Sequence, residues 1–524
     1  MMLDGSGVCT PAEILPWAAR IFTDKLALIS AGRAFSYTDL ERQSAAMASA
    51  LRQRGITEGD VVSICGQNSW QWVVAYHGAL RAGAVVNPLN VMLSGPELAY
   101  ALNDCHARAL FAAAAPTPAA AVAEQVPTLQ IVAEFGDASP HGAVGFAALL
   151  QEAVTPAPTV RPADPRELCA IAYTSGTTGH PKGAMQSHQS ILLNCALTAS
   201  MHGRNDRDIV VSALPAAHVY GNVVINSTFL TGGTVVLMER FNPAEALQLI
   251  AAEHATMFEG VPMMYGLMIS DPLFEHADLT SLRKSTVGGQ AMSPELARQW
   301  EKRSGARLLE LWGMTELSGL GATHSLHAPA VLGSVGMPLP GMEMKILDMG
   351  DSDCEAAVGE RGELVVRGPL VMMGYFGNPA GTAEVLDEEG WLRTGDVAFR
   401  DHDGYYYVVD RSKDMILTGG YNVYPAELER VIGEHPGVAM VGVGKRGDAV
   451  RGEIAVAYIV ARDGAQLNEQ DIVDFCATRL AAYKRPRAVV FVEQLPLTGS
   501  GKLLRRRLSA LDPIQACLSA GTAT

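Results

Sequence analysis

The segment Leu168–Gly183, LCAIAYTSGTTGHPKG, decides the fold class. Its apolar first part, residues 168–173, predicts a buried strand, and a helical pattern begins near Ser187. Similar β-branched runs, such as those at 61–65, 84–88, 209–212 and 234–237, alternate with helical patterns over about the first four hundred residues. Because parallel strands need helical crossovers, this alternation of strands and helices predicts an α/β fold with mostly parallel sheets covered by helices.

The C-terminal part of the chain has a different sequence pattern. From Arg361 onward, short strands separated by glycines predict a small antiparallel subdomain, and the tail over residues 414–508 is typical of a compact α+β lobe. In this lobe the sequence predicts helices at 424–435 and 468–480 and a pair of strands at 438–443 and 454–460. We therefore expect a large N-terminal domain that is followed by a separate small domain beginning at Asp414.

Length and composition exclude several classes of protein. The chain has 524 residues, more than one hydrophobic core usually supports, and its 48% hydrophobic content excludes a disordered chain. The 55 acidic residues outnumber the 40 basic ones, for a net charge of −15, which argues against nucleic acid as the main partner. Eight cysteines without a CxxC pair indicate a reduced interior rather than a disulfide or zinc framework.

The sequence also lacks signals for export or membrane insertion. The acidic N-terminus does not have the basic-then-apolar layout of a secretory signal. The most apolar stretch, residues 109–123, is interrupted by Pro116 and Pro118, so we expect no transmembrane segment. These features predict a cytoplasmic protein.

The residues between the predicted strand and helix have the composition of a phosphate-binding loop. Glycines permit close backbone approach, hydroxyl groups add hydrogen-bond donors, and Lys182 adds a cation. A Walker A motif is excluded, because the position that needs its second glycine holds Pro181. An ordinary surface loop rich in these residues is the alternative interpretation. The expected phosphate ligands are Ser175, Gly176, Thr177, Thr178, Gly179 and Lys182.

This loop resembles the signature loop of the adenylate-forming superfamily, which includes acyl-CoA synthetases, peptide-synthetase adenylation domains and firefly-type luciferases. Further segments resemble that family's motifs in the expected order over nearly the whole chain. They are LPAAHVYG at 214–221, GGQAMS at 288–293, LWGMTE at 311–316, TGD at 394–396, DRSKD at 410–414, GGYNVYP at 419–425 and TGSGK at 498–502. One such motif is weak evidence, whereas the ordered set is specific.

The resemblance implies carboxylate attack on the α-phosphorus of ATP, followed by thioester formation with coenzyme A. Two anions must meet in the first step, so the site needs cations and hydrogen-bond donors. The family pattern assigns the β- and γ-phosphates to the loop from Thr174 to Lys182 and the α-phosphate to Thr315. It assigns Mg²⁺ to Glu316 together with Thr174, and Mg²⁺ prefers one carboxylate plus phosphate oxygens.

The resemblance also implies a nucleotide site. Its members would be Gly289, Gln290, Ala291, Leu311, Trp312, Gly313, Met314, Thr315, Asp396 and Arg411. Asp396 and Arg411 would hold the ribose, although an aspartate after glycine is also common in turns. Trp312 stands where the family usually has tyrosine, which keeps an aromatic plane for adenine and removes a hydroxyl. A tryptophan of the hydrophobic core and a helix-capping role for Thr315 are the alternatives.

Two half-reactions in the family involve a C-terminal lobe that swings about a hinge. The resemblance therefore implies a large domain at 1–410, a hinge at 411–413 and a mobile lobe at 414–524. Lys413 lies at the hinge position, and Lys502 corresponds to the lysine that bridges the carboxylate and the α-phosphate. Gly420 would leave a channel for the pantetheine arm of coenzyme A. Without the resemblance, Lys413 and Lys502 read as ordinary surface lysines.

The resemblance places the acyl pocket around nine residues. They are His218, Tyr220, Gly221, Asn222, Gly260, Val261, Tyr265, Gly288 and Met314. None of them is Lys or Arg, so a second carboxylate would lack a partner, which disfavours dicarboxylic acids. His218 would lie near the acyl carboxylate, although a lone histidine is more often structural.

We therefore expect a small-molecule acid–CoA ligase that uses ATP, Mg²⁺ and coenzyme A. A medium- or long-chain fatty acid is the first choice of substrate, and an aryl or arylpropenoic acid is the second. An adenylating enzyme that serves a carrier protein and a non-catalytic homologue are the other classes considered. The oligomeric state is left open, with a homodimer as one alternative.

Overall fold

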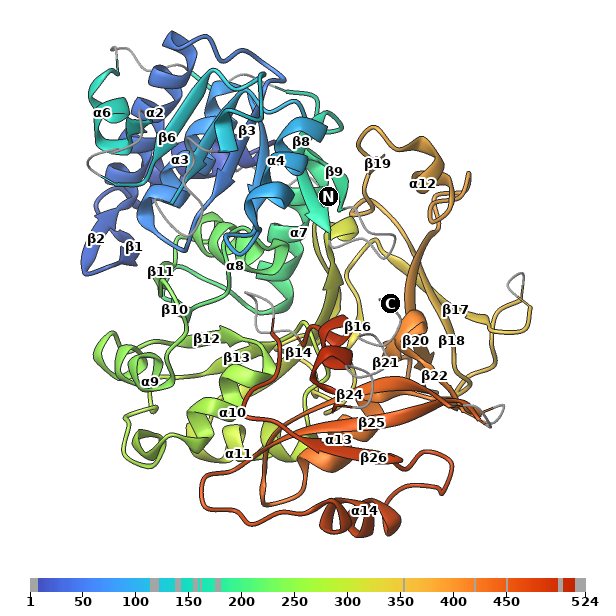
Figure 1. The fold of residues 1–524 in the computed structure, drawn as a ribbon. Coiled ribbons are helices and arrows are strands. Elements are labelled where there is room, and N and C mark those ends of the chain that lie inside the picture. Colours follow the sequence, from blue (N-terminus) through green and yellow to red (C-terminus); the bar gives the residue numbers. More distant parts are fainter. Residues whose placement is uncertain are drawn as a thin grey trace.

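The structure, a computed structural model, describes residues 8–113, 122–136, 143–153, 159–160, 163–174, 181–351, 354–418, 421–448, 451–497 and 503–513. It is an α/β fold with a smaller α+β lobe at the C-terminal end, as expected (Figure 1). Within these ranges no helix combines the length and apolarity needed to cross a membrane.

The first layer is an eight-stranded sheet in the order β19-β9-β8-β4-β3-β5-β6-β7. Strands β3 to β6 pair in parallel, and all five residues of β3 are buried, as their continuous apolar runs predicted. The strands are β3 (Val61–Cys65), β4 (Val85–Leu89), β5 (Ala109–Ala112), β6 (Ile131–Glu134), β7 (Val144–Gly145), β8 (Leu168–Thr174), β9 (Lys182–Ser187) and β19 (Gly374–Tyr375). Helices α2 (Tyr37–Gln53), α3 (Trp70–Ala82) and α4 (Gly95–Asp104) belong to this part of the chain.

The second layer is a nine-stranded sheet in the order β16-β15-β14-β13-β12-β10-β11-β1-β2. Its strands β14, β13, β12, β10, β11 and β1 pair in parallel, and the strands at both ends pair antiparallel. The strands are β1 (Leu26–Ser30), β2 (Arg33–Ser36), β10 (Ile209–Ser212), β11 (Thr234–Leu237), β12 (Met257–Gly260), β13 (Lys284–Val287), β14 (Arg307–Met314), β15 (Gly319–Thr323) and β16 (Met337–Pro338). Helices α9 (Pro243–Ala252), α10 (Pro262–Ser270) and α11 (Pro294–Ser304) connect the parallel strands.

Helices α7 (His188–Met201) and α8 (Val219–Leu230) lie between the two sheets (Figure 1). Every residue of α8 is buried, which agrees with a helix that is apolar or small on all its faces. The two sheets and these helices share one hydrophobic core.

A third, antiparallel sheet consists of β17 (Glu343–Asp348), β18 (Gly362–Arg367), β20 (Leu392–Arg400) and β21 (Tyr406–Arg411). The predicted antiparallel subdomain is therefore present, but its expected start at Arg361 was wrong, because β17 already pairs with β18 along its full length. A polar connection of thirteen residues, 349–361, separates the two strands in sequence and concealed their pairing.

The C-terminal lobe has its own sheet and its own core. Its elements are β22 (Ile416–Thr418), β23 (Tyr421–Val423), α13 (Pro425–Gly433), β24 (Val438–Asp448), β25 (Gly452–Ala461), α14 (Glu469–Ala477) and β26 (Ala488–Phe491). The predicted pairing of β24 with β25 is confirmed, and buried residues from both helices pack against this sheet. The lobe is thus a separate structural unit that follows the antiparallel sheet in the sequence.

Candidate functional site

The parallel strands of the nine-stranded sheet bring several sequence motifs to one edge. The carboxyl ends of parallel strands lie at the same edge of a sheet, which is where ligands bind in open α/β folds. The motifs lie at the carboxyl ends of β10, β12, β13 and β14 or directly after them. The predicted site residues placed at this edge are His218, Tyr220, Gly221, Asn222, Gly260, Val261, Gly288, Gly289, Gln290, Ala291, Leu311, Trp312, Gly313, Met314 and Thr315.

Strands β8 and β9 form an antiparallel hairpin whose connection is the glycine-rich segment 175–180, which lies outside the described residues. Thr174 pairs with Lys182 at the base of the loop, and the Thr174 hydroxyl donates to the Lys182 carbonyl oxygen at 3.4 Å. The chain does not pass straight from the loop into a helix, since β9 intervenes and Ser187 then caps α7. This strand was not predicted, because its sequence KGAMQS has little β-propensity and owes its conformation to pairing on both sides.

The hairpin also contacts the end of β14. The side-chain amide of Gln186 in β9 donates to the carbonyl oxygen of Thr315 at 2.8 Å. Thr315 begins the 3₁₀ helix Thr315–Leu317, which contains Glu316. The base of the glycine-rich loop therefore adjoins the predicted metal-binding carboxylate.

A tyrosine that the sequence analysis did not single out joins these two elements. Tyr375 in β19 donates its hydroxyl hydrogen to Glu316 Oε1 at 2.9 Å, and the Lys182 Nζ lies 5.1 Å from the Tyr375 ring centroid. Lys182 Nζ is also 3.5 Å from Glu384 Oε2. Burial first, and then the neighbouring Glu316, raise the pKa of Tyr375, so its hydroxyl remains a donor at neutral pH.

The antiparallel sheet contributes a second carboxylate. Asp396 in β20 accepts a hydrogen bond from Trp312 Nε1 at 2.8 Å, and its other oxygen lies 2.7 Å from Arg411 Nε. Asp396 and Arg411 are also opposite each other in the β20–β21 pairing. The structure thus brings Trp312, Asp396 and Arg411 together, as the family pattern implied, and links them by a buried hydrogen bond that the sequence did not reveal.

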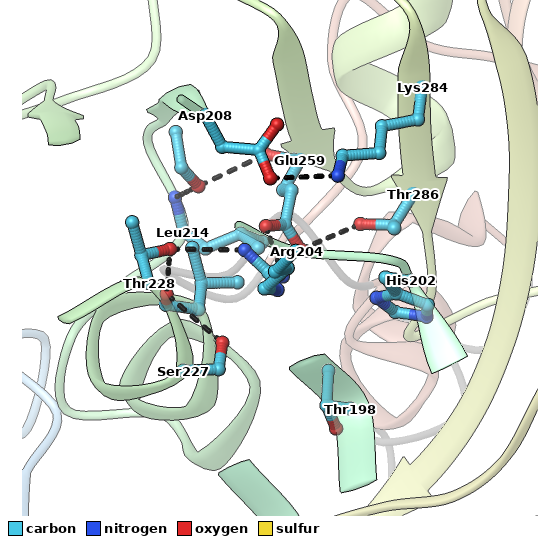
Figure 2. A network of polar contacts seen from close by, with 12 residues as sticks. Thr198, His202, Arg204, Asp208, Leu214, Ser227, Thr228, Glu259, Lys284 and Thr286 are labelled. Carbon is cyan, nitrogen blue, oxygen red and sulfur yellow. Dashed lines mark hydrogen bonds and ion pairs between the residues drawn. The ribbon is translucent and has the colours of Figure 1, made fainter. Parts of the chain in front are cut away.

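The predicted acyl pocket is backed by a polar network. The hydroxyls of Tyr220 and Thr286 are 2.6 Å apart, and Thr286 donates to Glu259 Oε2 at 2.8 Å. Glu259 pairs with Arg204 at 2.5 Å, and neither side chain is exposed. Figure 2 shows Arg204 between Glu259 and Thr228, whose hydroxyl accepts a second guanidinium hydrogen bond. Burial first, and then Glu259, raise the pKa of Tyr220 well above its usual value.

A second buried ion pair lies beside the first. Lys284 Nζ is 2.8 Å from Asp208 Oδ2, and Figure 2 shows this pair next to Arg204. Burial first, and then Arg204 and Lys284, lower the pKa of His202 well below its usual value. The acidic residue within the apolar run MFEG at 257–260 is the sequence signal that could have indicated this network.

Other pocket residues have clear packing roles. The hydroxyl of Tyr265 donates to the Thr286 carbonyl oxygen at 2.6 Å, and its ring packs edge-on against Trp300. A Cβ at Gly221 would lie 2.2 Å from the Pro215 carbonyl oxygen, so only glycine fits there. His218 is the N-cap of α8, and its Nδ1 accepts from the Tyr220 backbone N–H at 3.2 Å.

The remaining predicted residues belong to the connection with the C-terminal lobe or lie outside the described ranges. Lys413 lies in the 3₁₀ helix Ser412–Asp414, between β21 of the antiparallel sheet and β22 of the lobe. The residues outside the described part of the chain are Ser175, Gly176, Thr177, Thr178, Gly179, Gly420 and Lys502.

Comparisons with known proteins agree with this arrangement. A family model described as AMP-binding enzyme matches residues 15–376, and one described as AMP-binding enzyme C-terminal domain matches residues 427–502. The chain is 33% identical to a long-chain-fatty-acid–CoA ligase of Bacillus subtilis (strain 168), over 95% of this chain and 94% of that one. It is 37% identical to a feruloyl-CoA synthase of an Amycolatopsis species, over 93% and 96% of the two chains.

A solved anthranilate CoA ligase in complex with anthranoyl-AMP has the same fold. Its TM-score is 0.90 at 26% identity, and 98% of each chain is covered. The first family model alone spans more than half of the sequence. The chain therefore belongs to the AMP-binding enzymes, the adenylate-forming superfamily, in its acyl-CoA synthetase branch.

Proposed function

We propose that this protein is an acid–CoA ligase for an apolar monocarboxylic acid. The acid's carboxylate oxygen attacks the α-phosphorus of ATP, and pyrophosphate leaves with the electrons of the broken P–O bond. The sulfur of coenzyme A then attacks the acyl carbon of the adenylate, and AMP leaves as the thioester forms. The observation that carries the proposal is the convergence of the β8–β9 hairpin, the end of β14 and the β20–β21 pair on one edge of the nine-stranded sheet.

The contacts in the structure support particular roles for the nucleotide-binding residues. Lys182 supplies a cation at the base of the loop, where it would meet the β- and γ-phosphates together with residues 174–179. Thr315, whose backbone is tied to that hairpin, suits the α-phosphate. Residues 289–291 and 311–314 would border adenine. Asp396, which contacts both Trp312 and Arg411, would hold the ribose.

Glu316 fits a magnesium ligand. It is buried, and one of its oxygens accepts a hydrogen bond from Tyr375, whose ring also contacts the Lys182 ammonium. Mg²⁺ in nucleotide sites takes one or two carboxylates plus phosphate oxygens, so a single carboxylate with Thr174 suffices. When bound, the ion would neutralise charge that develops on the leaving pyrophosphate.

A medium- or long-chain fatty acid remains our first choice of substrate. The pocket residues His218, Tyr220–Asn222, Gly260, Val261, Tyr265, Gly288 and Met314 offer no cation for a second carboxylate, and methionines adapt to flexible chains. The likeness to a long-chain-fatty-acid–CoA ligase along almost the whole chain supports this choice.

An aryl or arylpropenoic acid is the second candidate. The Tyr220 hydroxyl is fixed by Thr286, so its ring would offer a rigid aromatic surface to a flat acid in the proposed pocket. The likeness to a feruloyl-CoA synthase and to an anthranilate CoA ligase supports this alternative.

A pyrophosphate-release assay with a panel of acids tests the proposal. Fatty acids of increasing length, benzoates and arylpropenoates are offered with ATP and Mg²⁺, with and without coenzyme A. We expect release with at least one acid, faster turnover with coenzyme A and a thioester as product. Exchange of labelled pyrophosphate into ATP with none of the acids would refute the proposed reaction.

The two half-reactions require a movable lobe, and we propose the division 1–410, hinge 411–413 and 414–524. The position of Lys413 between the antiparallel sheet and the lobe supports this division, as does the lobe's separate core. Gly420 would border the pantetheine channel. The seven described cysteines are all free thiols, which supports a reducing compartment such as the cytoplasm.

A further inference from the structure

We propose that Tyr375 is a positioning residue of the nucleotide site, whose hydroxyl orients the Glu316 carboxylate and whose ring holds the Lys182 ammonium. The proposal rests on the proposed function, because it assigns to Tyr375 the task of aligning the metal ligand with the phosphate-binding lysine. Neither the sequence motifs nor the family pattern given above includes this residue.

The backbone around Tyr375 is held on both sides. On one side, β19 pairs with β9, and the N–H groups of Met373 and Phe376 donate to carbonyl oxygens of Met185 and Gly183. On the other side, the N–H of Met372 donates to the carbonyl oxygen of Glu316 itself at 2.8 Å. The position of Tyr375 relative to both partners is therefore set by main-chain hydrogen bonds.

Helix α12 (Pro379–Ala383) adds a further restraint. The Tyr375 N–H donates to the Thr382 hydroxyl oxygen at 2.9 Å. Gly374 has φ = +133°, a conformation that side-chain-bearing residues rarely adopt, and it turns the chain into β19. The ring of Tyr375 is only 8% exposed, so its side chain has little freedom to move away.

The two contacts of the side chain differ in strength. The bond from the hydroxyl to Glu316 is charge-assisted and buried, which makes it one of the stronger kinds of hydrogen bond. The Lys182 ammonium lies over the ring at a distance typical of cation–π contacts. The competing ion pair of Lys182 with Glu384 is long, and the Glu384 side chain is 70% exposed, so solvent weakens it. Lys182 can therefore exchange Glu384 for a phosphate without leaving the ring.

A purely structural tyrosine would look different. The hydroxyl of Tyr406, equally buried in the antiparallel sheet, donates to the backbone carbonyl oxygen of Met344 at 2.6 Å. Tyr375 instead directs its hydroxyl to a carboxylate and its ring face to a lysine. Groups that hydrogen-bond to metal-ligating carboxylates commonly change metal affinity when they are removed.

Binding of ATP to the full-length protein, measured by calorimetry over a range of Mg²⁺ concentrations, tests the proposal without turnover. Tyr375→Phe removes the hydroxyl and keeps the ring, so we expect half-saturation to need about tenfold more Mg²⁺. Its ATP affinity in excess EDTA should equal that of the wild type. Tyr375→Leu removes the ring as well and should weaken ATP binding in EDTA too.

The matched control is Tyr406→Phe, which loses a comparable buried hydrogen bond and should leave both binding curves unchanged. In a Glu316→Gln background, Tyr375→Phe should add no further change in the Mg²⁺ dependence, because the hydroxyl acts through that carboxylate. Unaltered Mg²⁺ dependence in Tyr375→Phe, or losses that simply add in the double variant, would overturn the proposal. Failure of the wild type to bind ATP would instead contradict the proposed function.

Discussion

At the scale of single residues, Trp312 is where this chain departs from the family pattern. The expected tyrosine would present a hydroxyl, whereas the indole places its N–H against Asp396 at 2.8 Å. Trp312 is only 7% exposed, so the residue packs mostly in the core. The indole thus combines the two roles that the sequence left open, a core residue and a neighbour of the nucleotide site.

Trp312→Phe should therefore weaken ATP use while the fold is retained. The substitution keeps an aromatic plane and removes one donor from a buried carboxylate, and hydrogen bonds to charged groups are worth about 1.5–3 kcal/mol. We expect kcat/KM for ATP to fall by about tenfold or more. Steady-state kinetics at saturating acid measures this. Trp391→Phe, which alters a tryptophan that stacks with Lys345 and Arg367, is the control and should leave the constant unchanged.

His77 gives a prediction about pH. It is buried in α3 against Phe229, neither ring nitrogen has a hydrogen-bond partner in the described part of the chain, and burial lowers its pKa from 6.5 to about 3. Between these values the unfolded chain binds the extra proton, so stability falls as pH decreases below the unfolded pKa. At about pH 5 the free energy of unfolding is about 2 kcal/mol lower than at neutral pH because of this group.

His77→Leu should remove this component of acid sensitivity. Thermal unfolding at about pH 7 and about pH 5 measures the change for each protein. The expected result is a smaller decrease of the unfolding midpoint on acidification in the variant. An equal decrease in both proteins would show that His77 does not carry this dependence.

At the scale of elements, sequence predicted those strands whose own residues favour them. The β-branched runs of β3, β10 and β11 carry their conformation locally, and the structure confirms them. Strand β9 and the two-residue strand β19 form only because they pair with neighbouring strands, so no local sequence pattern predicted them. The helices of the lobe were expected at 424–435 and 468–480, and they are shorter, since tertiary packing decides where a helix ends.

The residues of the candidate site likewise fall into two groups, those that sequence motifs identify and those that only the fold brings to the site. Residues that belong to contiguous motifs, such as Trp312 and Asp396, were identified from sequence, and the structure brings them together. Tyr375 lies 59 residues from Glu316 along the chain and reaches it through tertiary contacts, namely the pairing of β19 with β9 and the hydrogen bond from the Met372 N–H to the Glu316 carbonyl oxygen. The Arg204–Glu259 pair likewise depends on contacts between elements distant in sequence. Local spacing contains no information about such partners.

The buried Arg204–Glu259 ion pair predicts that even a conservative substitution of one partner lowers stability strongly. Glu259→Gln in β12 leaves Arg204 buried without a compensating charge, and breaking a buried pair from one side costs about 3–5 kcal/mol. The unfolding transition of the N-terminal part should shift to clearly lower temperature. The double variant Arg204→Met with Glu259→Gln should regain much of the loss, because no lone charge remains. Glu295→Gln, which breaks an exposed pair with Arg298, should have almost no effect.

At the scale of the whole molecule, charged and polar contacts connect the C-terminal lobe to the body. Asp410 Oδ2 accepts from the Ala426 N–H at the start of α13 at 2.7 Å, and Arg361 lies 3.8 Å from Glu427. Lys484 of the lobe also contacts Glu427, so that carboxylate would keep a partner if the lobe moved away from Arg361. Interfaces of this polar kind permit relative domain motion, which suits the proposed hinge at residues 411–413.

If the lobe alternates between two orientations, the two half-reactions should be separable by mutation. Lys502→Ala removes the proposed cation between carboxylate and α-phosphate, so exchange of pyrophosphate into ATP should fall by about a thousandfold while thioester formation from supplied acyl-adenylate persists. Gly420→Leu should show the opposite pattern, because a side chain would obstruct the proposed pantetheine channel. Arg507→Ala, an exposed neighbour in the same basic segment, is the control for lost charge and should support both steps. Equal loss of both half-reactions in Lys502→Ala and in Gly420→Leu would mean that one fixed arrangement serves both steps and that the lobe does not exchange these residues.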